Sequence, residues 1–125
     1  MTDITLVGLG LLRLMVTKMN EYCPDRWVIV DYGGANGKDR YAIMAGWRGG
    51  YLYGDSWRRS SPLTSAVKKE DGWVVETGSG SRYFLSEKSI GVTMTTQSLI
   101  VQMPVIVIDD VFEISGVFHS LKGRE

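Results

Sequence analysis

The chain has 125 residues, of which 44% are hydrophobic and 22% charged, as expected for one globular domain with its own core. Its 14 basic and 14 acidic side chains cancel, which argues against a strongly basic nucleic-acid binder. The one cysteine, Cys23, excludes an intramolecular disulfide and a cysteine-based metal cage, and it suits a reducing compartment. We therefore expect a single cytoplasmic domain that spans residues 1–125.

The first predicted element is a helix over Leu9–Tyr22. Apolar residues recur there at three- and four-residue spacing, as one buried helix face requires: Leu11, Leu12, Met15, Val16 and Met19. Pro24 ends the segment, because the residue before a proline avoids helical geometry. The apolar run over residues 4–16 is too short to cross a bilayer, contains Arg13 and lacks a basic start. We therefore expect neither a membrane span nor a secretory signal.

The next predicted elements are short strands. Trp27–Val30 is a compact apolar run, and residues 33–37 read Gly-Gly-Ala-Asn-Gly, a composition typical of a loop. Tyr41–Trp47 and Tyr51–Tyr53 favour two further strands around a Gly-Gly turn.

Residues 61–85 predict a three-stranded antiparallel meander. Large apolar residues occupy its odd positions: Leu63, Val67, Trp73, Val75, Tyr83 and Leu85. They share one face only if both turns preserve parity, which three-residue loops at 70–72 and 78–80 achieve with glycine in a left-handed third position. This register places Val67 opposite Val75, Trp73 opposite Leu85, Val75 opposite Tyr83, and Glu76 opposite Arg82 on the solvent face.

The C-terminal third begins with residues 91–96 and 98–103, which alternate weakly, as strands do. Pro104 then precedes Val105–Ile108, a run of four β-branched residues that predicts a strand covered on both faces. Residues 111–118 fit either another strand or a closing helix. The predicted fold is therefore α+β, with the N-terminal helix packed on a curved antiparallel sheet or partial barrel of about six to eight strands.

Gly8 and Gly10 superficially resemble the opening of a dinucleotide-binding unit. They follow an apolar run, open the predicted helix and precede Asp31 by about twenty residues, where an acidic side chain would bind a ribose. In that motif a third glycine lets the helix approach the strand, whereas this chain has Arg13 there. A nucleotide- or small-ligand-acting protein that uses Gly8, Gly10 and Asp31 is therefore an alternative and not the leading interpretation.

A dense aromatic and basic cluster lies between Trp47 and Arg59. Its candidate binding residues are Trp47, Arg48, Tyr51, Tyr53, Trp57, Arg58 and Arg59. Aromatic rings stack on bases and arginine pairs with phosphate, so the cluster suits single-stranded nucleic acid. The same residue types dominate the hot spots of protein–protein interfaces. A third interpretation is structural, with Tyr51, Tyr53 and Trp57 on the inner face of a hairpin and the arginines solvated.

Residues typical of catalysis are sparse. His119 is the only histidine, Cys23 has no base near it in the sequence, and Ser60-Ser61 lacks a nucleophile-elbow pattern. An acidic group near the C-terminus suits Mg²⁺ or acid–base chemistry, and equally the start of a helix: Asp109, Asp110 and Glu113. We predict no catalytic residue, no metal site and no cofactor.

Two segments, Ser60–Leu63 and Thr77–Leu85, carry a resemblance to a known pattern. With the hairpin between them, their Ser-Ser-Pro and Thr-Gly-Ser-Gly-Ser-Arg-Tyr sequences resemble small uncharacterised bacterial β-meander proteins. The resemblance implies a shared meander and no particular activity.

We predict a non-enzymatic binding module that works through protein contacts. Small accessory proteins of mobile elements, including inhibitors of host systems, are often of this size and lack catalytic motifs, so this chain is a candidate for that class. We also expect a homodimer or larger assembly, because residues 95–108 carry no charge, whereas edge strands normally carry charges that prevent pairing. A second copy related by a two-fold axis would cover two such strands. No membrane partner is expected, and nucleic acid is the less favoured partner.

Overall fold

The computed structural model describes residues 20–33, 40–49 and 55–122. The strands are β1 (Glu21–Tyr22), β2 (Arg26–Asp31), β3 (Tyr41–Trp47), β4 (Ser56–Arg59), β5 (Leu63–Lys68), β6 (Gly72–Thr77), β7 (Arg82–Ser86) and β8 (Ile106–Ile108). The helices are the 3-10 turn η1 (Glu87–Ser89), α3 (Met94–Ile100) and α4 (Val111–Lys122).

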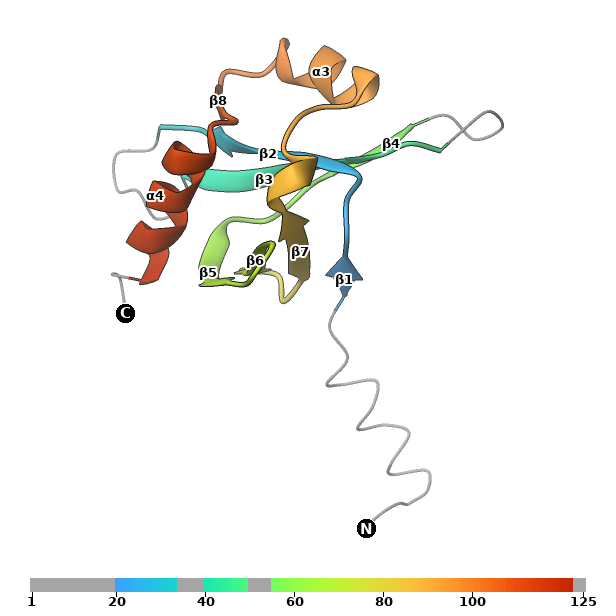
Figure 1. Ribbon diagram of the computed structural model, residues 1–125. Coiled ribbons are helices and arrows are strands. Elements are labelled where there is room, and N and C mark those ends of the chain that lie inside the picture. The colour runs from blue at the N-terminus through green and yellow to red at the C-terminus, as the bar shows by residue number, and fades with distance from the viewer. Residues whose placement is uncertain (1–19, 34–39, 50–54, 123–125) are drawn as a thin grey trace, which may run out of the picture.

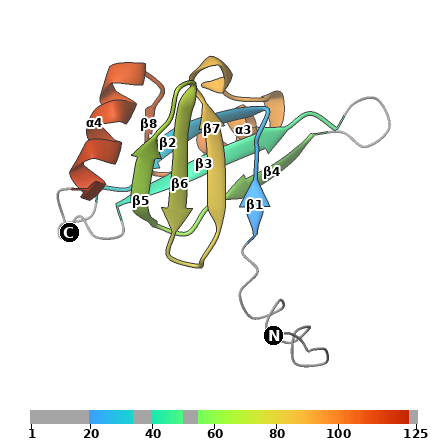
Figure 2. The ribbon, with the colours of Figure 1, turned by 60° about the horizontal axis from the view of Figure 1, so that its bottom comes forward.

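The strands form two sheets that pack face to face. Sheet A has the order β1-β7-β6-β5 and sheet B the order β4-β3-β2-β8. Sheet B is the middle layer: sheet A and α4 cover one of its faces, and α3 covers the other (Figure 1). Helix α4 runs beside β5 at one end of the stack, and β1 lies at the opposite edge of sheet A (Figure 2).

Alternation along β2 and β3 supplies two hydrophobic cores. Trp27, Ile29, Ile43 and Ala45 enter the first core, between sheet A, sheet B and α4. Val28, Val30, Ala42 and Met44 enter the second core, beneath α3 and Ile100. Successive strand residues point to opposite faces, so a continuous apolar strand becomes a wall shared by two cores.

The predicted fold class is wrong. The described part of the chain is mostly β, and its strands build two sheets, with no closed barrel and no single curved sheet. Residues 9–19 of the predicted N-terminal helix lie outside the described residues, and Glu21–Tyr22 form β1, which pairs in parallel with β7. The helix that covers the first core is α4, which confirms the helical alternative for residues 111–118.

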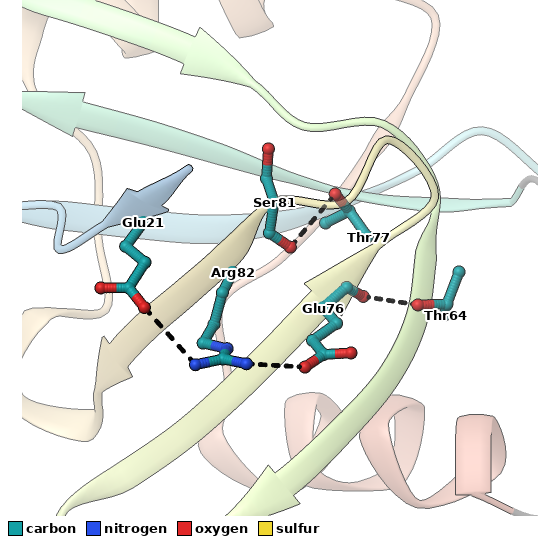
Figure 3. Close-up of polar contacts among 6 residues, drawn as sticks. All are labelled: Glu21, Thr64, Glu76, Thr77, Ser81 and Arg82. Carbon is teal, nitrogen blue, oxygen red and sulfur yellow. Dashed lines mark hydrogen bonds and ion pairs between the residues drawn. The ribbon is translucent and has the colours of Figure 1, made fainter. Parts of the chain in front are cut away.

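The predicted register between β6 and β7 is confirmed. Trp73 pairs with Leu85, Val75 with Tyr83 and Glu76 with Arg82, and the four apolar side chains are buried in the first core. The loop over residues 78–80 has Gly80 in the left-handed region at φ +91°. On the outer face, the Arg82 guanidinium lies between Glu21 of β1 and Glu76 of β6, 3.4 Å from a carboxylate oxygen of each (Figure 3).

The predicted turn at residues 70–72 is wrong. Lys69 and Gly72 exchange backbone hydrogen bonds, so the loop has two residues and Gly72 belongs to β6. A Cβ on Gly72 would lie 1.8 Å from the Leu85 carbonyl oxygen, which explains why glycine occupies this strand position. Val67 therefore pairs with Val74 instead of Val75, and its side chain is 50% exposed. An irregularity between Leu63 and Ser65 restores the parity, so Leu63 is buried.

The strands predicted over residues 91–103 are wrong, because α3 occupies most of this segment. Thr93 and Thr96 form a capping box: each side chain accepts a hydrogen bond from the other's backbone N–H, at 3.2 and 2.8 Å. The capping threonines pack on Gly46 of β3, where a Cβ would lie 2.9 Å from Thr93 Cγ2. The strand predicted over 105–108 is shorter than expected and lies at the edge of sheet B, with Ile106 68% exposed.

Candidate functional site

Strand β4 divides the predicted aromatic and basic cluster between two faces of sheet B. Trp57 pairs with Gly46 and Arg59 with Met44, which places both side chains on the α3 side of the sheet. Arg58 pairs with Ala45, a residue of the first core, and therefore lies on the opposite face. The cluster is thus two surfaces that share one exposed strand.

The α3 side of β4 contains an open cavity of about 470 Å³, here called the α3–β4 cavity. Its lining comes from strands β3 and β4, from α3 and from the turn that follows α3: Met44, Trp57, Arg59, Leu99, Gln102 and Met103. Four of these six side chains are hydrophobic, whereas Arg59 and Gln102 are polar. The cavity can hold an apolar group beside a cation and an amide.

Arg59 is an exposed cation held in a defined position. Its Nη1 donates to the Tyr32 hydroxyl at 3.0 Å, and its guanidinium carbon lies 5.9 Å from the centre of the Tyr32 ring. Among the described residues no carboxylate lies within ion-pair distance of Arg59. Trp57 is 48% exposed beside it, so a large ring and an uncompensated positive charge meet solvent together.

On the opposite face of β4, the aromatic and basic side chains make more contacts within the chain. Trp47 Nε1 donates to the Cys23 carbonyl at 3.0 Å, and the guanidinium carbon of Arg58 lies 4.6 Å from the centre of the Tyr22 ring. Tyr22 also packs on Tyr83, at 5.0 Å between ring centres. Arg48 is exposed, and its backbone N–H donates to the Asp25 carboxylate at 2.8 Å. Tyr51 and Tyr53 lie outside the described residues.

Tyr83 sits beneath this face with its hydroxyl buried. No hydrogen-bond partner for that hydroxyl is present among the described residues. Burial raises the pKa of Tyr83 above its usual value, and the nearby Arg58 guanidinium partly opposes the rise. The neutral phenol is therefore the form that this environment favours.

Asp31 is committed to contacts within the chain. Its carboxylate accepts from Arg40 Nε at 2.7 Å and Nη2 at 2.9 Å, and from the Gly33 backbone N–H at 2.8 Å. The pKa of Asp31 is lowered, mainly by the hydrogen bond from Arg40, although burial acts in the opposite sense. The predicted ribose-binding role would require these donors to be displaced. Gly8 and Gly10, its predicted companions, lie outside the described residues.

The residues considered for catalysis have structural or solvent-exposed positions. Ser60 is buried, and its hydroxyl accepts from the Ile43 N–H at 2.8 Å. Asp110 accepts from the N–H groups of Phe112 and Glu113, so the acidic group begins α4, as the helical alternative predicted. His119 is exposed on α4. No cluster of three His, Cys, Asp or Glu side chains suited to a metal ion occurs within residues 20–33, 40–49 and 55–122.

A second, shallower hollow of about 270 Å³ lies on sheet A, lined in part by Cys23, Val74 and Phe84. Val74 pairs with Phe84 there, and Val67 of β5 pairs with Val74 on the same face of sheet A without lining the hollow. Three charged residues of the turn between β5 and β6 also line this hollow: Lys69, Glu70 and Asp71. At about 270 Å³ it is smaller than the α3–β4 cavity, which has about 470 Å³.

Two of the predicted binding residues, Trp57 and Arg59, meet in the α3–β4 cavity. Sequence reasoning missed the other four lining residues, Met44, Leu99, Gln102 and Met103. It also missed Tyr32, which accepts the hydrogen bond from Arg59. The sequence indicated which face Met44 occupies, because Met44 and Ala42 are two residues apart in one predicted strand. The other residues come from segments that only the fold brings together.

No known protein family, curated protein or solved structure matches the chain. The resemblance to small bacterial β-meander proteins therefore stays a prediction. Within the described residues, none of the helices combines the length and the apolar character needed to cross a bilayer.

Proposed function

We propose that this chain is a non-enzymatic binding protein that recognises a protein partner through the α3–β4 cavity. The observation that carries the proposal is that a half-exposed Trp57 and Arg59, which has no carboxylate partner among the described residues, line the same largely apolar cavity. Tryptophan, methionine and arginine are enriched in the centres of protein interfaces, and tryptophan and arginine dominate their hot spots. All three residue types line this one cavity.

Protein contact is favoured over single-stranded nucleic acid by the division of the cluster. A nucleic-acid platform needs successive aromatic faces on one surface, with cations along the same track. Trp47 and Trp57 lie on opposite faces of sheet B, and the Trp47 ring edge is tied to Cys23. The formal net charge of zero also provides little long-range attraction for a polyanion.

A displayed random-peptide library tests the proposal. We expect the wild-type protein to enrich peptides that are lost with Trp57→Ala and retained with Phe112→Ala. Phe112 is a matched control, because its side chain is 83% exposed on α4 and does not line the cavity. Enrichment of the same peptides by the wild type and by Trp57→Ala would contradict the proposal, and so would the absence of any enrichment.

We also propose self-association, now based on β8 instead of on two adjacent uncharged strands. β8 is an edge strand of sheet B, and Ile106 and Val101 are each 68% exposed in a run without charge. Light scattering should give a mass near twice 13.9 kDa for the wild type, and Ile106→Lys should give a folded monomer. A monomeric wild type would refute self-association.

The single cysteine supports the proposal of a cytoplasmic location.

A further inference from the structure

We propose that the partner binds as an extended acidic segment that adds a strand to the free edge of β4 and places an apolar side chain in the α3–β4 cavity. This inference rests on the proposed function and specifies the mode of binding and the chemistry of the partner. It combines three features of the same four-residue strand: an edge that no other described strand covers, an adjoining cavity and two arginines on opposite faces.

The backbone edge follows from the hydrogen-bond alternation of an antiparallel pair. The Ser60 N–H donates to the Ile43 carbonyl at 2.9 Å, so Ser60 and Arg58 direct their backbone groups toward β3. The N–H and C=O groups of Trp57 and Arg59 therefore point away from β3. In the described part of the chain β4 is the last strand on this side of sheet B, so no strand receives those groups. Such an edge is a template for strand addition.

The side chains then define what each residue of an added strand would meet. In an added strand, side chains alternate between faces, as they do in β4. A residue opposite Trp57 lies on the cavity side of the sheet, beside the half-exposed indole ring of Trp57, which favours an apolar side chain. A residue opposite Arg59 lies on the same face beside a cation with no carboxylate partner among the described residues. A residue opposite Arg58 lies on the other face, beside the second cation.

A partner strand that runs parallel to β4 should therefore have an apolar residue followed by two acidic residues. A partner strand that runs antiparallel to β4 should have two acidic residues followed by an apolar residue. Arginine on each face favours carboxylates, because charge-assisted hydrogen bonds are stronger than neutral ones. The main-chain bonds give affinity, and the alternate side chains give specificity.

Two synthetic peptides serve as probes: acetyl-Thr-Val-Leu-Glu-Glu-Val-Thr-amide and acetyl-Thr-Val-Glu-Glu-Leu-Val-Thr-amide. Titration calorimetry with the full chain should show saturable binding of at least one peptide. Replacing both of its glutamates by lysine should weaken binding by about tenfold or more. Arg59→Glu should reverse this preference, whereas Phe112→Ala should leave it unchanged. Melting curves of each variant check that the fold is intact.

Backbone N-methylation separates strand addition from cavity binding. Methylating one alternate set of peptide nitrogens should abolish binding, because those N–H groups bond to β4, and methylating the other set should leave binding within a few-fold. If both methylated peptides bind like the parent, strand addition is wrong, while recognition through the cavity stands.

Two other results would overturn the proposed strand addition. One is the absence of saturable binding by either peptide up to about 1 mM. The other is a wild-type dimer that Arg59→Glu dissociates, because a second copy would then occupy the β4 edge. Peptide-library enrichment that depends on Trp57 would still support the proposed function in either case.

Discussion

Replacing Trp73 by alanine tests the structure of the first core. The Trp73 side chain is only 4% exposed, and its ring packs at 5.9 Å from Trp27 and 5.2 Å from Phe118, so three elements meet on it. Truncating a buried aromatic residue costs about 3–5 kcal/mol, out of about 5–15 kcal/mol for a whole domain. For a chain of this length, 1 kcal/mol shifts Tm by about 3–5 °C, so we expect Tm to fall by roughly 10–25 °C.

Trp57→Ala provides the matched comparison, because it removes the same side chain from a position that is 48% exposed. We expect a change in the free energy of unfolding of about 1 kcal/mol or less. Urea melts followed by circular dichroism measure both variants without relying on tryptophan fluorescence. Equal losses of stability in the two variants would refute the reasoning, as would an unchanged Tm for Trp73→Ala. A stable Trp57→Ala protein also validates its use in the binding experiments.

Asp31→Asn should cost about 1–3 kcal/mol near neutral pH, because it removes the charge that accepts both Arg40 bonds. The folded-state pKa of Asp31 is lowered, so this contribution is complete above the usual carboxyl pKa and is lost as pH falls through the lower folded value. The urea midpoints of variant and wild type should therefore converge in acid, and a gap of constant size would contradict the assignment. Gly116→Ala should raise stability by about 0.5–1 kcal/mol, since its Cβ meets no atom within 4 Å in α4. Gly46→Ala should lower Tm, because its Cβ would meet Thr93; equal Tm shifts for the two glycine variants would count against the packing of α3. Thr93→Ala should cost about 1 kcal/mol through loss of the capping box, and unchanged amide exchange in α3 would contradict this.

Strong local patterns predicted part of the fold correctly. The apolar runs of β2 and β3 were visible because each is longer than a turn and bounded by turn residues. The register of β6 against β7 followed from side-chain parity together with a glycine that the loop requires at Gly80. The preceding turn was mistaken because Gly72 looks like a turn residue, whereas a neighbouring backbone in sheet A requires it.

The remaining errors arose where distant segments decide the structure. Residues 94–100 contain β-branched side chains and favour a strand locally, but the capping box and the small Gly46 beneath it stabilise a helix. The candidate site shows the same limit. Trp57 and Arg59 could be chosen by residue type, but their separation from Trp47 and Arg58 depends on the β3–β4 register. The cavity depends on where α3 crosses sheet B.

Strand β2 contributes side chains to both cores, which affects how the protein unfolds locally. Exposing the amides of β2 requires β3 and β8 to separate from it and requires both cores to lose contact with it. Local fluctuations of α3 or α4 can each uncover only one face of this strand. Hydrogen exchange in β2 should therefore proceed only through global opening, so its rate measures the stability of the whole described fold. The exposed edge of β4 belongs to the same sheet, so a partner strand added there would extend a sheet whose central strand is already protected on both faces.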